Sequence, residues 1–302
     1  MVPAALAFVG ALVYGSADFL GGLAAQRLRA VVVTSISAAA GTALLAALLL
    51  VAGGTPTSAD LAWGALSGVA AAIAISLLYG CLALGPMSVL SPITAVVSAL
   101  APVAWDAATG GAPLGAGALA GLALAVVAIV LVAFLPGRAR PRPSFRALAM
   151  AVGAGLGIGA FVILLDQISP AAGLAPLAAG RALSAILTGS VALVIVALAV
   201  RAGQTRSGAL RPPVEGVEPD PGPLRTAVVL TVACGLADAS ANALLFAALR
   251  AGESLSVVAA LTALYPAGTV ILAALVLHER LVPAQWVGLA LALVAGVLLA
   301  VG

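Results

Sequence analysis

Two aspartates interrupt segments that are otherwise apolar enough for lipid, and they are the residues best suited to chemistry. Asp238 lies near the middle of the apolar run 225–249, and Asn242 and Phe246 follow it at i+4 and i+8. This spacing places a carboxylate, an amide and an aromatic ring on one face of a helix. An ionised acid inside a bilayer costs roughly 3 kcal/mol on insertion scales, so such residues normally face protein or water. We interpret this face as a candidate ligand-binding or coupling surface. The alternative is that Asp238 only bonds a neighbouring helix.

The second intramembrane acid is Asp18, one helical turn after Tyr14 and on the same helical face. Arg181, a few residues into the apolar run 175–200, is a candidate counter-ion for either aspartate or a binder of anionic substrate groups. Two structural alternatives remain open. Asp18 could reach the membrane interface, and Arg181 could extend its head group to the lipid headgroups.

Further candidates for a cavity wall lie on other apolar runs. Tyr79 follows Ser76 in the apolar run 62–83. Thr262 and Tyr265 lie shortly before a proline in the apolar run 255–276. Tyr79 also aligns with Phe246 when the two halves of the chain are compared, which indicates aromatic walls on both sides of a shared cavity. The alternative for these rings is core packing.

Neither a metal site nor a cofactor is expected. The single histidine, His278, lies in a charged turn, and Cys81 and Cys234 fall inside apolar runs without metal-ligand spacing. The glycine-rich stretch 152–160 is also apolar, so it indicates close helix packing rather than a phosphate loop. Two membrane aspartates also occur in intramembrane aspartyl proteases, but their Tyr-Asp and Gly-x-Gly-Asp motifs are absent. We therefore expect no enzyme and no catalytic residues.

Composition indicates which elements position these side chains. The chain of 302 residues is 64% hydrophobic and 8% charged, whereas about a quarter of the residues of a soluble domain are charged. Its net charge of +3 comes from residues that lie mostly between apolar runs, so nucleic acid is not an expected partner. The runs are continuously apolar and have the length of a helix that crosses the hydrocarbon core, about 30 Å thick. The predicted class is an all-α polytopic membrane protein.

Ten membrane spans are predicted, and they form two units of five. The predicted spans are 3–24, 31–52, 62–83, 87–107, 114–135, 147–166, 175–200, 225–249, 255–276 and 283–301. The first five-helix repeat covers 1–136, a basic connection covers 137–146, and the second repeat covers 147–302 with a solvated, mobile polar loop at 201–225.

Similar blocks of sequence support the duplication. Residues 68–85 align with 235–252, and residues 121–126 align with 288–293 at the same offset. An odd number of spans in each unit inverts the second copy in the membrane, as in many secondary transporters. Arginines concentrate in odd-numbered loops, which predicts both termini outside the cell.

Three stretches carry a resemblance to a known family: YGSADFLGG (14–22), ALGPMSVLSPITAVVSALAPV (83–103) and ESLSVVAALTALYPAGTVILAALVLHERLVPAQWVGLALALVAGVLL (253–299). They resemble EamA-type members of the drug/metabolite transporter superfamily. The resemblance implies export or exchange of small metabolites, amino acids or drugs across a bacterial cytoplasmic membrane, through a cavity between the two halves. It also implies cytoplasmic termini, against the arginine distribution. The chain departs from the family pattern at Ala112, which aligns with Glu279.

The expected function is secondary active transport by alternating access, carried out by a monomer or homodimer in contact with lipid. No ATP-binding loop is recognisable, so a gradient must drive transport. Proton coupling is the main hypothesis, because burial favours the protonated form of a carboxyl group. Uncoupled exchange is the alternative. The two acids favour cationic or zwitterionic amines as substrates, whereas Arg181 favours anionic groups.

Overall fold

The computed structural model describes residues 2–109, 115–134, 143–212, 223–250, 265–278 and 283–301, and every regular element among them is helical. The long helices are α1 (Val2–Ala25), α2 (Ala30–Ala52), α3 (Ser58–Leu84), α4 (Met87–Ala108), α5 (Ala116–Phe134), α6 (Phe145–Asp166), α7 (Ala175–Arg201), α9 (Leu224–Arg250), α11 (Tyr265–Val276) and α12 (Pro283–Val301). A 3₁₀ turn, η1 (Pro170–Ala172), precedes α7, and a short helix, α8 (Arg206–Leu210), follows it.

The helices coincide with the predicted spans to within a few residues, except that the ninth span is described only from Tyr265 onward. Five of them, α2, α3, α6, α7 and α9, are long and apolar enough to cross a membrane. The predicted all-helical class is therefore confirmed, and these five helices indicate a membrane protein. The number of ten spans and the inversion of the repeats stay predictions.

Local capping explains where several helices begin and end. The Thr57 hydroxyl accepts a hydrogen bond from the Asp60 backbone N–H, and the Asp60 carboxylate accepts one from the Thr57 N–H at 2.8 Å, which together form a capping box at the start of α3. Gly53, with φ 61°, ends α2 in a backbone conformation that glycine adopts without a steric penalty. Within the predicted polar loop 201–225, the Thr205 hydroxyl caps the short helix α8, which was not predicted.

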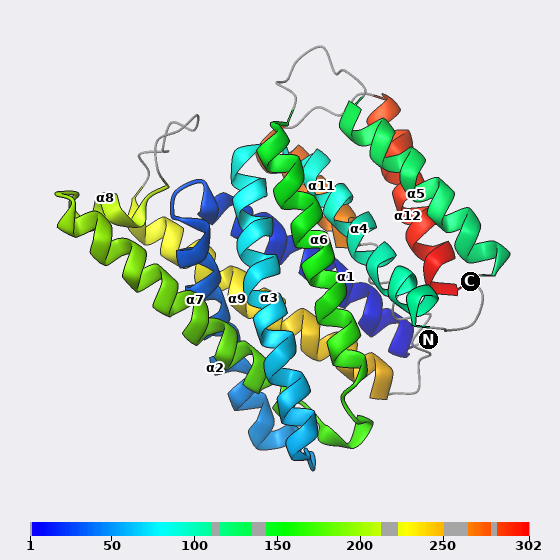
Figure 1. The fold of residues 1–302 in the computed structure, drawn as a ribbon, viewed down its shortest axis with the longest axis horizontal. Coiled ribbons are helices and arrows are strands. Elements are labelled where there is room, and N and C mark those ends of the chain that lie inside the picture. The colour runs from blue at the N-terminus through cyan, green and yellow to red at the C-terminus, as the bar shows by residue number, and fades with distance from the viewer. Residues whose placement is uncertain are drawn as a thin grey trace.

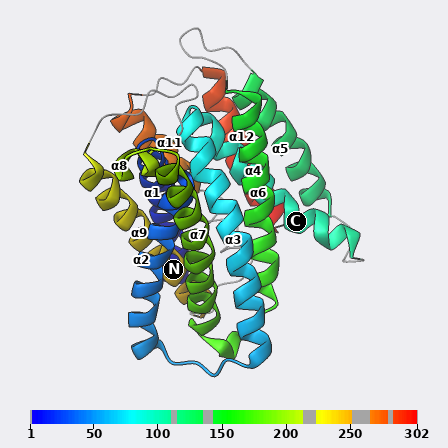
Figure 2. The same cartoon turned by 60° about the vertical axis from the view of Figure 1, so that its left-hand side comes forward.

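The most extensive contacts between helices occur in equivalent pairs in the two halves of the chain. The contact of α1 with α9 is equivalent to that of α6 with α3. In the same way, the contact of α3 with α7 is equivalent to that of α9 with α2, and the contact of α4 with α6 is equivalent to that of α11 with α1. The pairs α2·α7 and α5·α12 also pack closely, and α5 and α12 lie side by side at one edge of the bundle in Figures 1 and 2. This set is unchanged when α1, α2, α3, α4 and α5 are exchanged with α6, α7, α9, α11 and α12. A duplicated five-helix unit predicts this behaviour.

Glycines at matching sequence positions make matching approaches between helices. Gly68 of α3 lies against the backbone of Gly180 on α7, and Gly235 of α9 lies against the backbone of Ser37 on α2. Gly68 and Gly235 begin the two aligned sequence blocks. Helices approach this closely only where a side chain is missing, as at small-residue interfaces of membrane helices.

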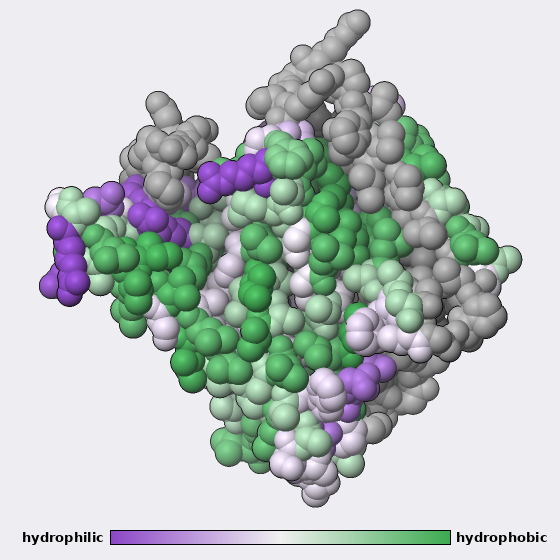
Figure 3. Space-filling view, in the orientation of Figure 1, coloured by the Kyte–Doolittle hydropathy of each residue, from purple (hydrophilic) through white to green (hydrophobic). Residues whose placement is uncertain are grey.

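The outer surface is apolar between the ends of the helices. Figure 3 shows a broad hydrophobic area over α7, α3 and α6, with hydrophilic residues near α8 and the helix ends. Large apolar side chains on this surface are strongly exposed, among them Leu193 at 73% and Ile73 at 58%. Exposure of this extent fits contact with lipid and not with water.

Candidate functional site

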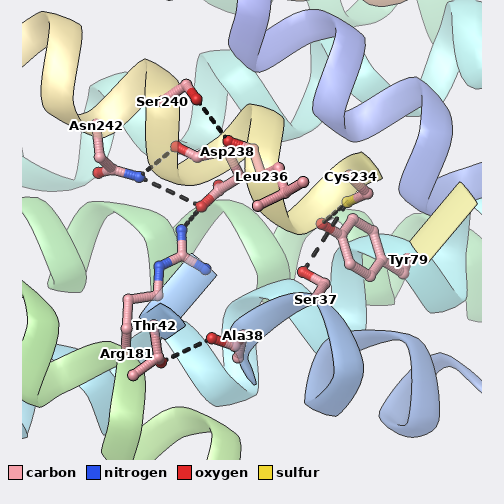
Figure 4. A network of polar contacts seen from close by, with 10 residues as sticks. All are labelled: Ser37, Ala38, Thr42, Tyr79, Arg181, Cys234, Leu236, Asp238, Ser240 and Asn242. Carbon is pink, nitrogen blue, oxygen red and sulfur yellow. Dashed lines mark hydrogen bonds and ion pairs between the residues drawn. The ribbon is translucent and has the colours of Figure 1, made fainter. Parts of the chain in front are cut away.

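An ion pair buried between α7 and α9 is the centre of the candidate site. An Nη2 group of Arg181 binds the Oδ2 atom of Asp238, and the two side chains are only 11% and 9% exposed. Figure 4 shows the Arg181 side chain reaching from α7 to the Asp238 carboxylate, which lies near the middle of α9. The structure therefore selects Asp238, and not Asp18 or the lipid headgroups, as the partner of Arg181.

Two neighbours complete the surroundings of this pair. The Asn242 side-chain amide donates hydrogen bonds to the Asp238 backbone carbonyl at 2.9 Å and to its Oδ2 atom at 3.3 Å. Gly41 on α2 lies against Gly235 and Ala239 of α9 and beside the aliphatic stem of Arg181, so its missing side chain allows α2 to approach α9 next to the ion pair. The predicted face of Asp238 and Asn242 is thus formed, while the Phe246 side chain lies outside the described residues.

A second polar chain joins three helices beside the ion pair. The Tyr79 hydroxyl on α3 lies 2.9 Å from the Cys234 sulfur on α9, and the Cys234 thiol donates to the Ser37 hydroxyl on α2 at 3.9 Å (Figure 4). Tyr79 is fully buried, with its ring packed against Gly21 of α1. The sequence analysis placed Cys234 in an apolar run without a polar partner, and it did not identify Ser37. No local pattern reveals such contacts, because they depend on how three helices are rotated.

Asp18 has no such partner. Its side chain is 7% exposed, and it makes neither a hydrogen bond nor an ion pair with the described part of the chain. Its carboxylate nevertheless interacts electrostatically with Tyr14, Tyr79 and Tyr265. The alternative in which Asp18 points out of the helix bundle is not realised, because α9, α11 and α3 pack around α1 and the side chain is buried.

The remaining predicted residues divide between bonded and unbonded hydroxyl groups. The Ser76 hydroxyl donates to the Ala72 carbonyl at 2.7 Å and lies 3.3 Å from the Thr34 hydroxyl, so its bonds stay within α3 and toward α2. The Tyr265 hydroxyl on α11 is buried and makes no hydrogen bond of standard geometry, although the Ser98 hydroxyl on α4 lies near it. The Ser91 hydroxyl on α4, which the sequence analysis did not identify, is also buried without a hydrogen bond to the described residues. Thr262 lies outside the described residues.

Two loop contacts lie at opposite ends of the α2·α7 pair. At one end, the Asp60 carboxylate accepts hydrogen bonds from the Ser169 backbone N–H at 2.7 Å and the Ser169 hydroxyl at 3.1 Å. The Thr55 N–H also donates to the Ala171 carbonyl at 3.0 Å. We name this set the Asp60 contact. It joins the α2–α3 connection to the segment before α7, seen at the lower edge of Figure 2.

At the other end, Arg29 binds the short helix α8. Its Nε group donates to the Ala209 carbonyl at 2.8 Å, and its backbone N–H donates to the Leu210 carbonyl at 2.9 Å. We name this set the Arg29 contact. The two contacts occupy equivalent places in the two halves of the chain. The α1–α2 connection is equivalent to the α6–α7 connection, and the connection after α7 is equivalent to the α2–α3 connection.

The described residues contain no group of three His, Cys, Asp or Glu side chains that could hold a metal ion.

Among known proteins, no family model and no curated protein matches the chain. A protein of known crystal structure matches it with a TM-score of 0.58 and 16% sequence identity, over 98% of this chain and 95% of that chain. This similarity shows that nearly the whole chain adopts a fold that occurs in another protein.

Proposed function

We propose that the chain is a secondary transporter, of the EamA type within the drug/metabolite transporter superfamily, that moves a small solute across a bacterial cytoplasmic membrane. In this proposal ten spans form two inverted five-helix repeats, and the substrate binds between them. The polar residues of α1, α3, α7, α9 and α11 would form the substrate-binding or coupling site: Tyr14, Asp18, Ser76, Tyr79, Arg181, Asp238, Asn242 and Tyr265.

The observation that carries the proposal is the Arg181–Asp238 pair. Its two charges are buried between helices that are themselves long and apolar enough to cross a membrane. Ionisable groups inside membrane helices are costly, and they typically mark pathways for substrates, ions or protons. A scaffold built from these helices would gain little from a charged interior.

Alternating access is supported by the exchange-related packing and by the two end contacts. The Asp60 contact and the Arg29 contact each hold one end of the α2·α7 pair. Opening one end while the other stays closed would expose an interior site to each side of the membrane in turn. Such rocking of one repeat against the other keeps the substrate site between the repeats and needs no pore.

Uncoupled exchange of two solutes is the second candidate within this class. An intramembrane aspartyl protease is less well supported, because such an enzyme needs two aspartates that share the activation of one water. Asp238 instead has a permanent cation as its partner. The guanidinium of Arg181 already occupies that carboxylate.

The first test is transport by the purified full-length protein in proteoliposomes that hold a pH gradient. A panel of amino acids, amines and organic cations is added, and collapse of the gradient is measured. At least one compound is expected to collapse the gradient. In the double variant Arg181→Gln/Asp238→Asn, whose net charge is unchanged, the rate of collapse is expected to fall at least about tenfold. A loss of about 1.4 kcal/mol of binding free energy already gives this factor. Counterflow of a labelled compound without proton movement would favour uncoupled exchange. The absence of both would contradict the transporter.

The second test locks the two ends. Cysteines at Thr55 and Ala171 would cross-link the Asp60 contact, and cysteines at Arg29 and Leu210 would cross-link the Arg29 contact, because each backbone pair is hydrogen-bonded and lies within reach of a disulfide. Each cross-link is expected to stop transport, and reductant is expected to restore it. The four single-cysteine variants are the controls. Unchanged transport with either end locked would contradict alternating access.

A further inference from the structure

Arginines gather at one end of the helix bundle. At this end α1 and α7 finish and α2, α6 and α9 begin, and we name it the arginine end. Its described arginines are Arg27, Arg29, Arg146, Arg201, Arg206, Arg211 and Arg225. No described residue there carries a carboxylate, and the α8–α9 connection outside the described residues adds only Glu215, Glu218 and Asp220. The arginine end therefore has an excess of positive charge.

Arg29 presents an anchored guanidinium at this end. Its Nε group donates to the Ala209 carbonyl at 2.8 Å, which fixes the side chain against α8. Its two terminal nitrogens make no hydrogen bond or ion pair with the described part of the chain, whereas Arg27 and Arg211 make further interactions within the protein. A guanidinium held in this way offers a fork of N–H groups that matches the oxygens of a phosphate.

Helix α8 and the end of α7 bring two further arginines to the same end. Helix α8 is anchored through Leu210, which packs on the core, and Ala209, which is buried. Arg206, which begins α8, and Arg201, which ends α7, are exposed and make no hydrogen bond or ion pair with the described residues. Figure 3 shows the hydrophilic surface near α8 beside the hydrophobic area over α7. We name Arg29, Arg201 and Arg206 the α8 junction.

An apolar strip on the outer face of α7 leads to this junction. Val191, Val194 and Leu198 precede Arg201 at alternating spacings of three and four residues, which places all four on one helical face. The three apolar side chains are between 50% and 58% exposed. A shallow depression on this helix is lined by Ser190, Val191, Val194 and Ile195. From Val191 to Arg201 the helix rises about 15 Å, which is the depth of one leaflet of a hydrocarbon core about 30 Å thick.

We propose that the α8 junction binds the headgroup phosphate of an anionic phospholipid, with one acyl chain along the strip on α7. A zwitterionic phospholipid has the same phosphate, but it also carries an ammonium group that the arginines repel. The site therefore selects an anionic headgroup such as that of phosphatidylglycerol. Each arginine near an anionic membrane surface strengthens the attraction by about fivefold. The inference does not depend on transport, since the lipid is a bound partner and not the transported solute.

Native mass spectrometry of the purified full-length protein in detergent tests the site, because it resolves single bound lipids. The protein is titrated with phosphatidylglycerol or with phosphatidylcholine of the same acyl chains. We expect the first phosphatidylglycerol to bind at least about fivefold more tightly than the first phosphatidylcholine. Glycerol phosphate, the soluble headgroup, is added as a competitor and is expected not to displace the lipid, because it lacks the acyl chains that contact α7.

Variants assign the selectivity to the α8 junction. Arg201→Gln and Arg206→Gln change exposed side chains, and each is expected to weaken phosphatidylglycerol binding about fivefold without changing phosphatidylcholine binding. Arg29→Lys keeps the charge but loses the fork, so it is expected to weaken binding less than Arg29→Gln. The matched control is Arg250→Gln, which removes the same charge at the opposite end of α9 and is expected to leave both affinities unchanged.

Three results would overturn the proposal. Equal affinities of the wild-type protein for the two lipids would show that the site does not select an anionic headgroup. Equal losses in Arg206→Gln and Arg250→Gln would show an effect of net charge and not of the α8 junction. Displacement by glycerol phosphate would assign the arginines to a soluble anion. The presence or absence of transport changes none of these measurements, so failure of the lipid site and failure of the transporter proposal are distinguishable.

Discussion

Replacing Asp238 by Asn is expected to destabilise the folded protein by about 3–5 kcal/mol, the range for a buried ion pair that loses one partner. The guanidinium of Arg181 would stay charged and buried without compensation, because arginine does not give up its proton in proteins. Replacing Arg181 by Gln is expected to cost less, because an isolated carboxylate can take up a proton. The free energy of unfolding in detergent, measured by denaturant titration, checks this order.

The double variant Arg181→Gln/Asp238→Asn distinguishes a coupled pair from two independent residues. It is expected to recover most of the stability lost by Asp238→Asn, since no unpaired charge remains. The matched control is Ser240→Ala on the same helix, where the hydroxyl bonds only the Leu236 carbonyl of its own helix at 2.7 Å. Additive losses in the double variant would mean that the two side chains do not depend on each other, and would contradict the buried ion pair.

Adding one methyl group at Gly68 is expected to weaken the packing of α3 on α7. The Cβ of Gly68→Ala would lie against the backbone of Gly180, which cannot rotate away as a side chain can. Overpacking of this kind costs about 1–3 kcal/mol, and more where the neighbour is rigid. Gly235→Ala is expected to cost a similar amount, because its added methyl would meet the backbone of Ser37 on α2.

Gly153→Ala is the matched control for both glycine variants. Its added methyl would meet only the end of the Leu77 side chain, at 3.1 Å, and that side chain can move. Alanine also favours helix over glycine by about 1 kcal/mol, so this variant should be neutral or stabilising. Unfolding free energies of the three variants give the comparison. Equal effects at all three positions would show that the close helix approaches at Gly68 and Gly235 do not limit packing.

Much of the architecture follows from local features of the sequence. Continuous apolar runs of membrane-spanning length predicted the described helices to within a few residues, because hydrogen bonding within one segment satisfies the backbone in lipid. The i+4 spacing likewise predicted that Asp238 and Asn242 share one helical face, on which the structure shows their hydrogen bond. The short helix α8 was missed because its five residues carry too little periodicity to distinguish them from a loop.

The candidate site was predicted as a set of residues but not as a set of partners. Arg181 could have paired with either aspartate, and Cys234 and Ser37 gave no signal of a shared contact with Tyr79.

The sequence alone determined the class of the protein, the helices, and which polar residues lie inside them. The tertiary structure decided that Asp238 is neutralised and that Asp18 is not. The physical reason is that a helix apolar on all sides has no hydrophobic face to define its rotation. Its rotation and tilt are set by contacts with other helices, such as the approaches at Gly68 and Gly235. These contacts join residues that are distant in the chain.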